Sequence, residues 1–295
     1  MNREADWQLY RTFLAVAREG SLSAAARRLG LAQPTVARHI EGLEAAVGGD
    51  LFVRSQRGLI PTDLARNVLP YAETLAATAA ALQRAASAAT DQVAGTVRVS
   101  ASEVIGVEWL PKILADLRRR HPGLAIELIA SNSVDDLQRR DADIAVRNVE
   151  PLQQSLVARR LPPIELGLFA HRDYLDARGV PQSLEELEAH DVIGFDRLSP
   201  ALYPLVERFP VLHRSMFALR VDSDVAQLAA IRAGFGIGMC QVPVARRDPL
   251  LVRLLSEAVS IDMGMWIVMP EELKTSARCR AVFDALVAGL SEDAR

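Results

Sequence analysis

The sequence has few cysteines and no long apolar run. Its two cysteines, Cys240 and Cys279, have neither the C-x-x-C spacing nor the neighbouring histidines of metal sites, which favours two buried hydrophobic residues over a redox switch. No apolar stretch approaches the roughly 20 residues that span a bilayer. The first seven residues carry three charges where a secretory signal would be apolar. We therefore expect a cytoplasmic protein with no membrane partner.

The sequence also lacks the motifs of common enzyme classes. It contains no G-x-S-x-G nucleophile elbow, no H-E-x-x-H zinc motif and no G-x-x-x-x-G-K-S/T phosphate loop. Its five histidines have neither triad nor metal-ligand spacing; they are His39, His121, His171, His190 and His213. These absences argue against an enzyme and against a bound cofactor. A solute carrier is the other alternative, but it leaves the first 90 residues without a role.

What the sequence does contain is a large apolar fraction and an uneven distribution of charge. Half of the 295 residues are apolar, enough for the buried cores of two or three domains. The net charge of −3 divides into +2 for residues 1–60, whose basic residues are all arginines, and −5 for the remainder. A basic segment on an acidic body favours a nucleic-acid partner for that segment alone.

The first 47 residues predict three short helices. Apolar residues recur at helical spacing from Trp7 to Arg18, which predicts an amphipathic first helix. A second helix is expected over Ala24–Leu29, with Ser21 or Ser23 as its cap. A third is expected from Gln33 to about Val47.

The segment after the third helix favours a two-stranded wing. Pro34 lies in the first helical turn, where its missing N–H has no structural cost. The apolar stretch Leu51–Arg54, the turn Ser55–Gly58 and Leu59–Ile60 predict two short strands. The residues expected on the buried face of the third helix are Val36, Ile40, Leu43 and Val47.

A long helix is expected from Asp63 to about Ala89, with Thr62 as its cap and a kink or a later start at Pro70. Apolar residues step along it by fours and threes, a seam that is typical of paired helices. The alternative is a helix that packs on its own domain. The seam residues are Leu64, Val68, Tyr71, Leu75, Thr78 and Leu82.

Beyond Val93, short apolar runs alternate with amphipathic helices such as Ile105–Arg119 and Ser223–Ala233. Such alternation predicts α/β units, in which ligands bind where strands end and helices begin. About 200 residues suffice for two lobes with a cleft between them. The expected strands are Thr96–Ser100, Ala125–Ile129, Ile144–Val146, Leu166–Ala170, Val192–Phe195, Phe217–Val221, Ile237–Cys240 and Met265–Met269.

Residues 13–61 closely resemble the N-terminal domain of LysR-type transcriptional regulators. The matching positions are Phe13, Ala17, Gly20–Leu29, Gln33–Val36, Ile40, Leu43-Glu44, Gly48, Leu51–Arg54 and Arg57–Leu59. The stretch from Gly95 to Pro111, the strand entry Asp143–Ala145 and the segment Ala233–Gly238 are similar to the effector domain of that family. The resemblance therefore covers nearly the whole chain.

This resemblance implies an α/β multidomain protein. A winged helix-turn-helix is expected at 1–61, a linker and dimerisation helix at 62–92, and a two-lobed, Rossmann-like effector domain, similar to periplasmic binding proteins, at 93–295. Lobe 1 is expected at about 93–163 and 270–295, and lobe 2 at about 164–269. The implied partners are double-stranded promoter DNA, a small-molecule effector and further copies of the chain in a homodimer or homotetramer. RNA polymerase is a further candidate partner.

The first candidate site is the outward surface of the third helix, which would read base edges in the major groove. Gln33, Thr35 and Arg38 lie on that surface, and His39 either contacts DNA or covers the helix flank. Two departures from the family pattern, alanines at 32 and 37 where serine is common, remove a cap and a hydroxyl. The full set of expected DNA-contacting residues is Ser23, Arg28, Gln33, Pro34, Thr35, Arg38, His39, Arg54 and Arg57.

Of the adjacent Arg27 and Arg28, we expect one to form an ion pair within the domain and the other to face outward. Arg54 and Arg57 on the wing are expected to meet phosphate or the minor groove, the alternative being a solvated turn.

The second candidate site consists of polar residues that follow expected strands. Ser100–Ser102 ends the first strand of the effector domain, Asn132 and Ser133 follow the second, and Ser223 follows the strand Phe217–Val221. Helix starts offer free amides and the positive end of the helix dipole, which favour an anion. The resemblance places these residues at the effector site; plain helix caps are the alternative.

Arg147 follows the expected strand Ile144–Val146, near the crossover between lobes. It could clamp an effector carboxylate with two hydrogen bonds, or it could pair with Asp143 or Glu150, and the sequence leaves both open. Phe195 could form an apolar wall or pack in the core. We therefore expect a small anionic effector, such as a carboxylate.

Overall fold

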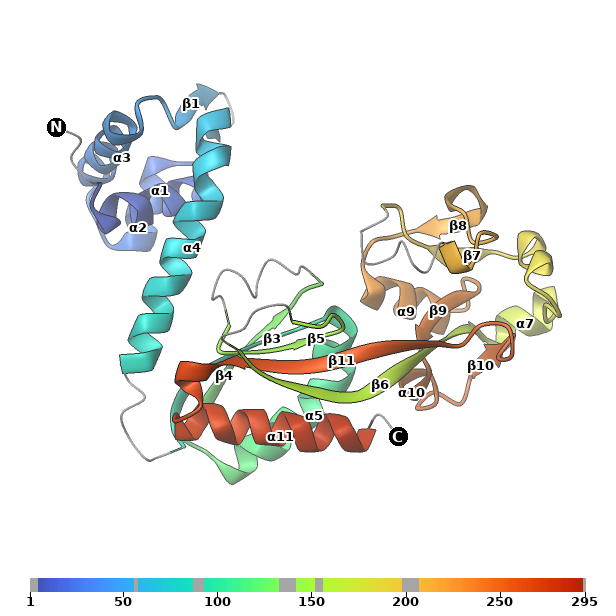
Figure 1. Cartoon of the computed structure of the whole chain (residues 1–295). Helices are drawn as coiled ribbons and strands as arrows, with labels where there is room; N and C mark the ends of the chain where they lie inside the picture. The colour runs from blue at the N-terminus through green and yellow to red at the C-terminus, as the bar shows by residue number, and fades with distance from the viewer. Residues whose placement is uncertain are drawn as a thin grey trace. The chain divides into compact units, whose positions relative to one another are not determined.

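The computed structural model describes residues 5–55, 58–86, 93–132, 142–151, 156–197 and 207–293. The chain forms two compact units, the first made of the described residues up to Gln83 and the second of those from Arg84 onward (Figure 1). Among the described residues, one hydrophobic core belongs to the first unit and two belong to the second. In these described ranges no helix has the length and apolar character to cross a membrane.

The first unit begins with three helices close to the predicted positions, although the second starts at Leu22, two residues before the predicted Ala24. Ser21, rather than Ser23, caps the second helix by accepting a hydrogen bond from the Ala24 amide at 3.2 Å. The third helix has Ala32 at its cap position and no side-chain cap, as expected from the missing hydroxyl. The three helices are α1 (Trp7–Glu19), α2 (Leu22–Leu29) and α3 (Gln33–Val47).

The wing consists of two antiparallel strands, β1 (Phe52–Ser55) and β2 (Gly58–Pro61). The Leu59 amide donates to the Gly20 carbonyl at 2.8 Å, which fixes the wing against the end of α1. Gly58 has a φ of 111°, and a Cβ there would lie 2.6 Å from the Gly20 oxygen. Only glycine fits this close approach.

The long helix α4 (Asp63–Ala86) begins as predicted, because the Thr62 hydroxyl accepts from the Ala65 amide at 3.1 Å. Pro70 lies inside the helix. The expected end near Ala89 lies outside the described residues.

The seam predicted for α4 divides into two parts. Leu64 and Val68 pack against the core of the first unit, as the single-domain alternative predicted. Further along, Tyr71, Leu75 and Leu82 are 76%, 47% and 71% exposed. The second part is therefore an apolar stripe on a solvent-facing helix.

The second unit is built on a seven-stranded sheet with the order β10-β6-β11-β5-β3-β4, in which β9 also pairs with β6. Strands β3, β4 and β5 are parallel, whereas β6 and β11 run antiparallel to their neighbours. The strands are β3 (Gly95–Ala101), β4 (Leu124–Ala130), β5 (Ile144–Arg147), β6 (Leu156–His171), β9 (Gly238–Gln241), β10 (Leu251–Leu254) and β11 (Ile261–Pro270).

The strands β6 and β11 are longer than the sequence predicted, and they run side by side through both lobes (Figure 1). Pro162 and Pro163 lie within β6, and neither has an N–H to donate to a strand ladder. The pairing register shifts between Met263 and Met265, opposite these prolines, so the ladder is irregular where the donors are missing. The lobe boundaries remain predictions. The expected boundaries place Trp266 in lobe 2, but Trp266 pairs with Arg147 of β5, a strand expected in lobe 1.

Helices pack on both parts of this sheet. The expected helix at 105–119 begins with a π-helical segment, and Pro111 at its junction with α5 lacks the N–H of a regular α-helix. In lobe 1, α11 packs on α5, β3 and β11, and in lobe 2, α9 packs on β6, β7 and β9. The remaining elements are η1 (Ile105–Trp109), α5 (Leu110–Arg120), α7 (Arg172–Arg178), η2 (Glu185–Ala189), β7 (Val192–Gly194), η4 (Arg214–Met216), β8 (Phe217–Arg220), α9 (Asp224–Arg232), α10 (Val242–Ala245), η5 (Glu271–Leu273) and α11 (Ala277–Asp293).

Both cysteines are buried, as predicted from the sequence. Burial raises the pKa of the Cys240 thiol to about 12 and also raises the pKa of Cys279. A thiolate is the reactive form, so this burial disfavours a redox role.

Candidate functional site

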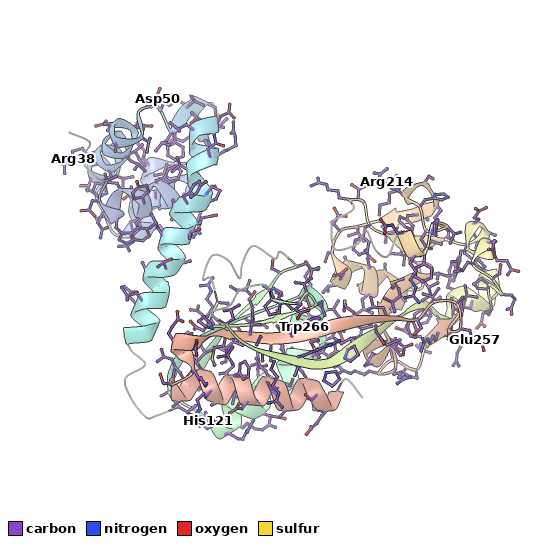
Figure 2. All side chains as sticks on the ribbon, in the orientation of Figure 1. Arg38, Asp50, His121, Arg214, Glu257 and Trp266 are labelled. Atoms are coloured by element: carbon purple, nitrogen blue, oxygen red, sulfur yellow. The ribbon has the colours of Figure 1, made fainter. Side chains whose placement is uncertain are left out.

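The outward face of α3 presents the residues that the sequence predicted for base reading. Gln33, Pro34 and Arg38 are exposed, and Thr35 is half-buried. Arg38 projects from the surface of the first unit (Figure 2). The buried face of the helix comprises Val36, Ile40 and Leu43.

Two predicted residues at the start of this surface contact each other. The Ser23 hydroxyl donates to Oε1 of Gln33 at 3.0 Å. This contact orients the glutamine amide and leaves its NH₂ group as a donor. The oriented NH₂ group of Gln33 can therefore donate a hydrogen bond to an acceptor on a base or a phosphate.

His39 is held by the body of the first unit. Its Nδ1 lies 2.8 Å from the Thr12 hydroxyl, which itself donates to the Gln8 carbonyl at 2.8 Å. Because that hydroxyl proton is already used, Nδ1 of His39 carries the proton and donates. A DNA contact by His39 would have to use Nε2, and it remains a prediction.

The structure identifies which of the two adjacent arginines forms an ion pair. Arg28, the one predicted to contact DNA, pairs with Glu19 at 2.7 Å. Arg27 is exposed, and it has no ion pair within the described ranges. The pair of Arg28 is half-exposed and contributes about 0–1 kcal/mol, so it does not prevent a phosphate contact.

On the wing, Arg54 is exposed on β1, directly opposite Leu59. Arg57 lies outside the described residues. Neither wing contact is tested by the geometry, and both remain predictions.

The second predicted site brings together residues that are far apart in the chain. Asn132, after β4, accepts from the Glu103 amide at 3.0 Å and donates to the Asp224 carboxylate at 2.7 Å. Ser223, the cap of α9, donates to the Glu103 carboxylate at 2.7 Å. The start of the helix after β3, the loop after β4 and the start of α9 therefore converge on one place.

Glu103 and Asp224 belong to this site, although sequence reasoning did not select them. Each directly follows a predicted serine, Ser102 or Ser223, in the first turn of a helix. That position is also typical of an acid that stabilises the positive end of a helix. The sequence signal was therefore present, but it did not distinguish a site residue from a plain helix start.

Arg147 lies at the end of β5 and is only 4% exposed. Its Nη2 donates to the Ser100 hydroxyl at 2.6 Å and its Nη1 to the Val146 carbonyl at 3.0 Å. The Asp143 carboxylate accepts from the Arg98 amide at 2.9 Å. These contacts fix a buried positive charge at the end of the sheet, and they leave both earlier interpretations of Arg147 open.

The other predicted effector residues give less information. Ser133 lies outside the described residues. Phe195 lies one position beyond β7, is half-buried and does not belong to the hydrophobic cores. The hydroxyl oxygen of Ser102 is buried and has no hydrogen-bond partner among the described residues.

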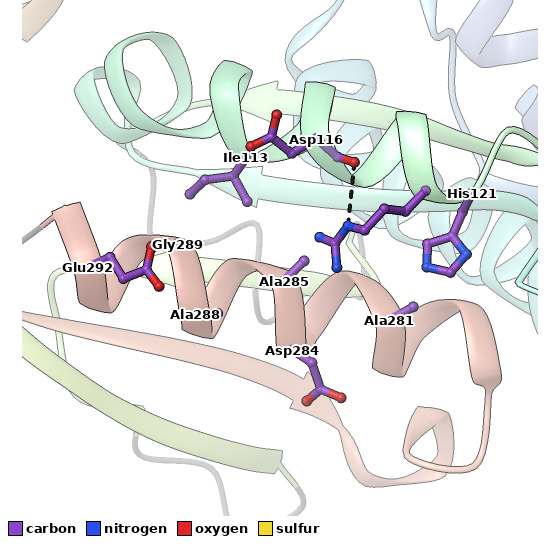
Figure 3. Close-up of a pocket in the computed structure, with 10 residues that line it drawn as sticks. Ile113, Asp116, His121, Ala281, Asp284, Ala285, Ala288, Gly289 and Glu292 are labelled. Atoms are coloured by element: carbon purple, nitrogen blue, oxygen red, sulfur yellow. Dashed lines mark hydrogen bonds between the residues drawn. The ribbon is translucent and has the colours of Figure 1, made fainter.

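A groove of about 360 Å³ lies between α5 and α11 (Figure 3). Gly289 lets the helices approach, because a Cβ there would lie 2.6 Å from the Ile113 side chain. Arg120 and His121 line the groove where α5 ends. None of the predicted effector residues that the structure describes lines this groove.

Three short helices with a wing, a long helix and a two-lobed α/β domain form the architecture typical of bacterial one-component transcription regulators. Two family models match the chain: the lysR-family bacterial regulatory helix-turn-helix protein over residues 7–66, and the LysR substrate binding domain over residues 90–291. The second covers more than half of the chain. The chain belongs to the LysR family.

Curated relatives agree with this assignment. The HTH-type transcriptional regulator CrgA of Neisseria meningitidis is 31% identical over 189 residues, which are 62% of this chain and 61% of that protein. A HTH-type transcriptional regulator of Xanthomonas campestris is 24% identical over 96% of this chain and 85% of its own length. The match therefore spans about three fifths of CrgA and most of the second relative.

Solved structures share the fold over nearly the whole chain. CrgA has a TM-score of 0.60 at 25% identity, covering 97% of this chain and 99% of that one. The LysR family regulator CbnR has a TM-score of 0.66 at 21% identity, covering 98% and 99%. A further structure holds full-length CbnR with its target DNA, at a TM-score of 0.62, 22% identity and coverage of 96% and 99%.

Proposed function

We propose that this protein is a sequence-specific, DNA-binding transcriptional regulator, that it is not an enzyme, and that it acts on promoter DNA in the cytoplasm. The observation that carries the proposal is the exposed start of α3, where Gln33 is oriented by Ser23 and Arg38 projects outward. Glutamine and arginine suit adenine and guanine edges in the major groove. The CbnR structure with its target DNA supports such a role for the shared fold.

The regulator responds to a small, carboxylate-bearing metabolite bound between the two lobes. Support for the carboxylate comes from the buried positive charge of Arg147 at the end of β5. The convergence of two helix starts and Asn132 supports the location between the lobes. An arginine can hold a carboxylate with two charge-assisted hydrogen bonds. The active form is a homodimer or homotetramer, supported by the exposed stripe on α4. RNA polymerase is the further partner proposed at the promoter.

The DNA-binding part is tested by binding of the full chain to genomic fragments, followed by titration of the selected site and of random DNA. The salt dependence should be steep, because phosphate contacts release counterions. Arg38→Ala should weaken specific binding by about 1–3 kcal/mol and random binding much less. Arg159→Ala, which removes an exposed arginine from β6, is the control. Equal loss on both DNAs would make Arg38 a phosphate contact, and no selection by the parent protein would refute the function.

The effector part is tested by a thermal-shift screen of small carboxylates. A carboxylate that stabilises the parent should stabilise Ser102→Ala less and Arg147→Ala least, because losing a charge-assisted partner costs more than losing a neutral one. Operator affinity without the ligand should stay nearly unchanged in both variants. Equal stabilisation of the parent and both variants would place the site elsewhere.

A further inference from the structure

The contact between the lobes contains two acidic side chains and, in the described ranges, no ion pair for either. Glu103 accepts from the Ser223 hydroxyl at 2.7 Å, and Asp224 accepts from the Asn132 amide at 2.7 Å. Both donors are neutral. The two acids come from different lobes, so their charges are brought together only by the fold.

This arrangement leaves negative charge uncompensated. Burial raises the pKa of the Asp224 carboxyl; the hydrogen bond from Asn132 opposes this shift and the nearby charge of Glu103 adds to it. The amides at the two helix starts offset part of this negative charge. A cationic group placed between the carboxylates would remove the remaining repulsion.

A second observation points to a ligand at this place. The Ser102 hydroxyl oxygen is buried and, in the part of the chain that the structure describes, has no hydrogen-bond partner; Ser102 directly precedes Glu103. Buried hydroxyl groups in proteins are nearly always hydrogen-bonded. Because Ser102 directly precedes Glu103 at the start of the same helix, its hydroxyl is a candidate third partner beside the two carboxylates.

We propose that the effector carries an ammonium group, held by the side chains of Glu103, Asp224 and Ser102. An ammonium has three donors, one for each of these acceptors, and a positive charge for the two acids. This inference rests on the proposed function and adds the ligand class. A ligand with both an ammonium and a carboxylate, such as an α-amino acid, also agrees with the fixed charge of Arg147.

The test uses the full-length protein at neutral pH and a panel of matched probes. The panel contains the standard α-amino acids, the amines that correspond to their decarboxylation, and the des-amino carboxylates of the same side chains. Binding is measured by thermal shift and then by titration calorimetry. An amine-bearing probe should bind, whereas its des-amino counterpart should bind at least about tenfold more weakly, as expected when a charge-assisted contact is lost.

Variants then locate the ammonium. Glu103→Gln and Asp224→Asn should each weaken binding of that probe by about ten- to a hundredfold, because each removes a charge-assisted contact. Glu257→Gln removes an acid on an exposed loop of the second lobe and should leave the affinity unchanged (Figure 2). If either acidic variant fails to fold, as judged by circular dichroism, Ser102→Ala should still weaken binding severalfold.

Two outcomes would overturn the ligand class. One is tighter binding of a des-amino carboxylate to Glu103→Gln than to the parent, since the acid would then repel the effector. The other is a panel in which no amine-bearing probe binds the parent. Neither outcome bears on the proposed function. The proposed function fails if the parent protein selects no DNA sequence, or if no small molecule alters its DNA binding.

Discussion

Leu75 provides a quantitative test of the apolar stripe on α4. The residue is 47% exposed, so about half of its surface remains available to a partner helix. Full burial of a leucine side chain stabilises by about 1.5–3 kcal/mol, and the exposed half accounts for about 0.7–1.5 kcal/mol. In a twofold dimer the residue occurs twice, which gives about 1.5–3 kcal/mol for the assembly.

Leu75→Ala should therefore raise the dissociation constant of the dimer by about ten- to a hundredfold. Leu75→Asp should raise it further, because a carboxylate in an apolar interface is desolvated without a partner. Sedimentation equilibrium over a range of concentrations measures both effects. The matched control is Leu250→Asp, a leucine with 45% exposure in the second unit.

The reasoning fails if Leu75→Asp and the parent protein have the same association constant. The stripe of Tyr71, Leu75 and Leu82 would then be a solvent-exposed face, and the pairing interpretation of the seam would be wrong. A loss of association in the Leu250→Asp control would also count against it, because the effect would not be specific to α4.

Three further predictions concern the second unit. Asp224→Asn should raise the unfolding temperature of the ligand-free protein at neutral pH, because the raised pKa of Asp224 means that its ionisation destabilises the fold. This gain in unfolding temperature should shrink as the pH falls through the pKa of Asp224. A gain that does not depend on pH would contradict this cause. The buried indole N–H of Trp109 donates to the Gln241 side chain at 2.7 Å. Gln241→Leu removes this acceptor and should lower the free energy of unfolding in urea by about 1–3 kcal/mol. Adding Trp109→Phe should recover part of the loss. Cys240 and Cys279 should react with a thiol reagent at pH 8 only after unfolding, and rapid labelling of the native protein would refute the burial argument.

The first unit was highly predictable because its signals are local. Gly20, Gly30 and Gly48 end helices in the left-handed conformation, and Pro34 marks the first turn of α3. Each signal acts within one helical turn, so the sequence contains all that is needed to place the element. The choice between Ser21 and Ser23 as cap was settled only by the structure.

In the second unit, prediction failed where distant segments meet. The length of β6 depends on β11, more than 90 positions away, whose irregular register accommodates the two prolines. The groove between α5 and α11 depends on Gly289 meeting Ile113, and no local pattern indicated that contact. The sequence identified eight of the strands that the structure describes in this unit, but it missed β10 (Leu251–Leu254) and did not indicate which strands pair.

The effector site shows the same limit in its chemistry. Helix starts at Ser102 and Ser223 predicted an anion, because free amides and the helix dipole favour negative charge. In the folded protein these starts already carry their own anions: Glu103 reaches Ser223 across 120 positions of sequence, and Asp224 opens α9. A carboxylate bound at the same amides would have to displace them. The carboxylate of an effector therefore belongs near Arg147, and the helix starts are better suited to its positive group.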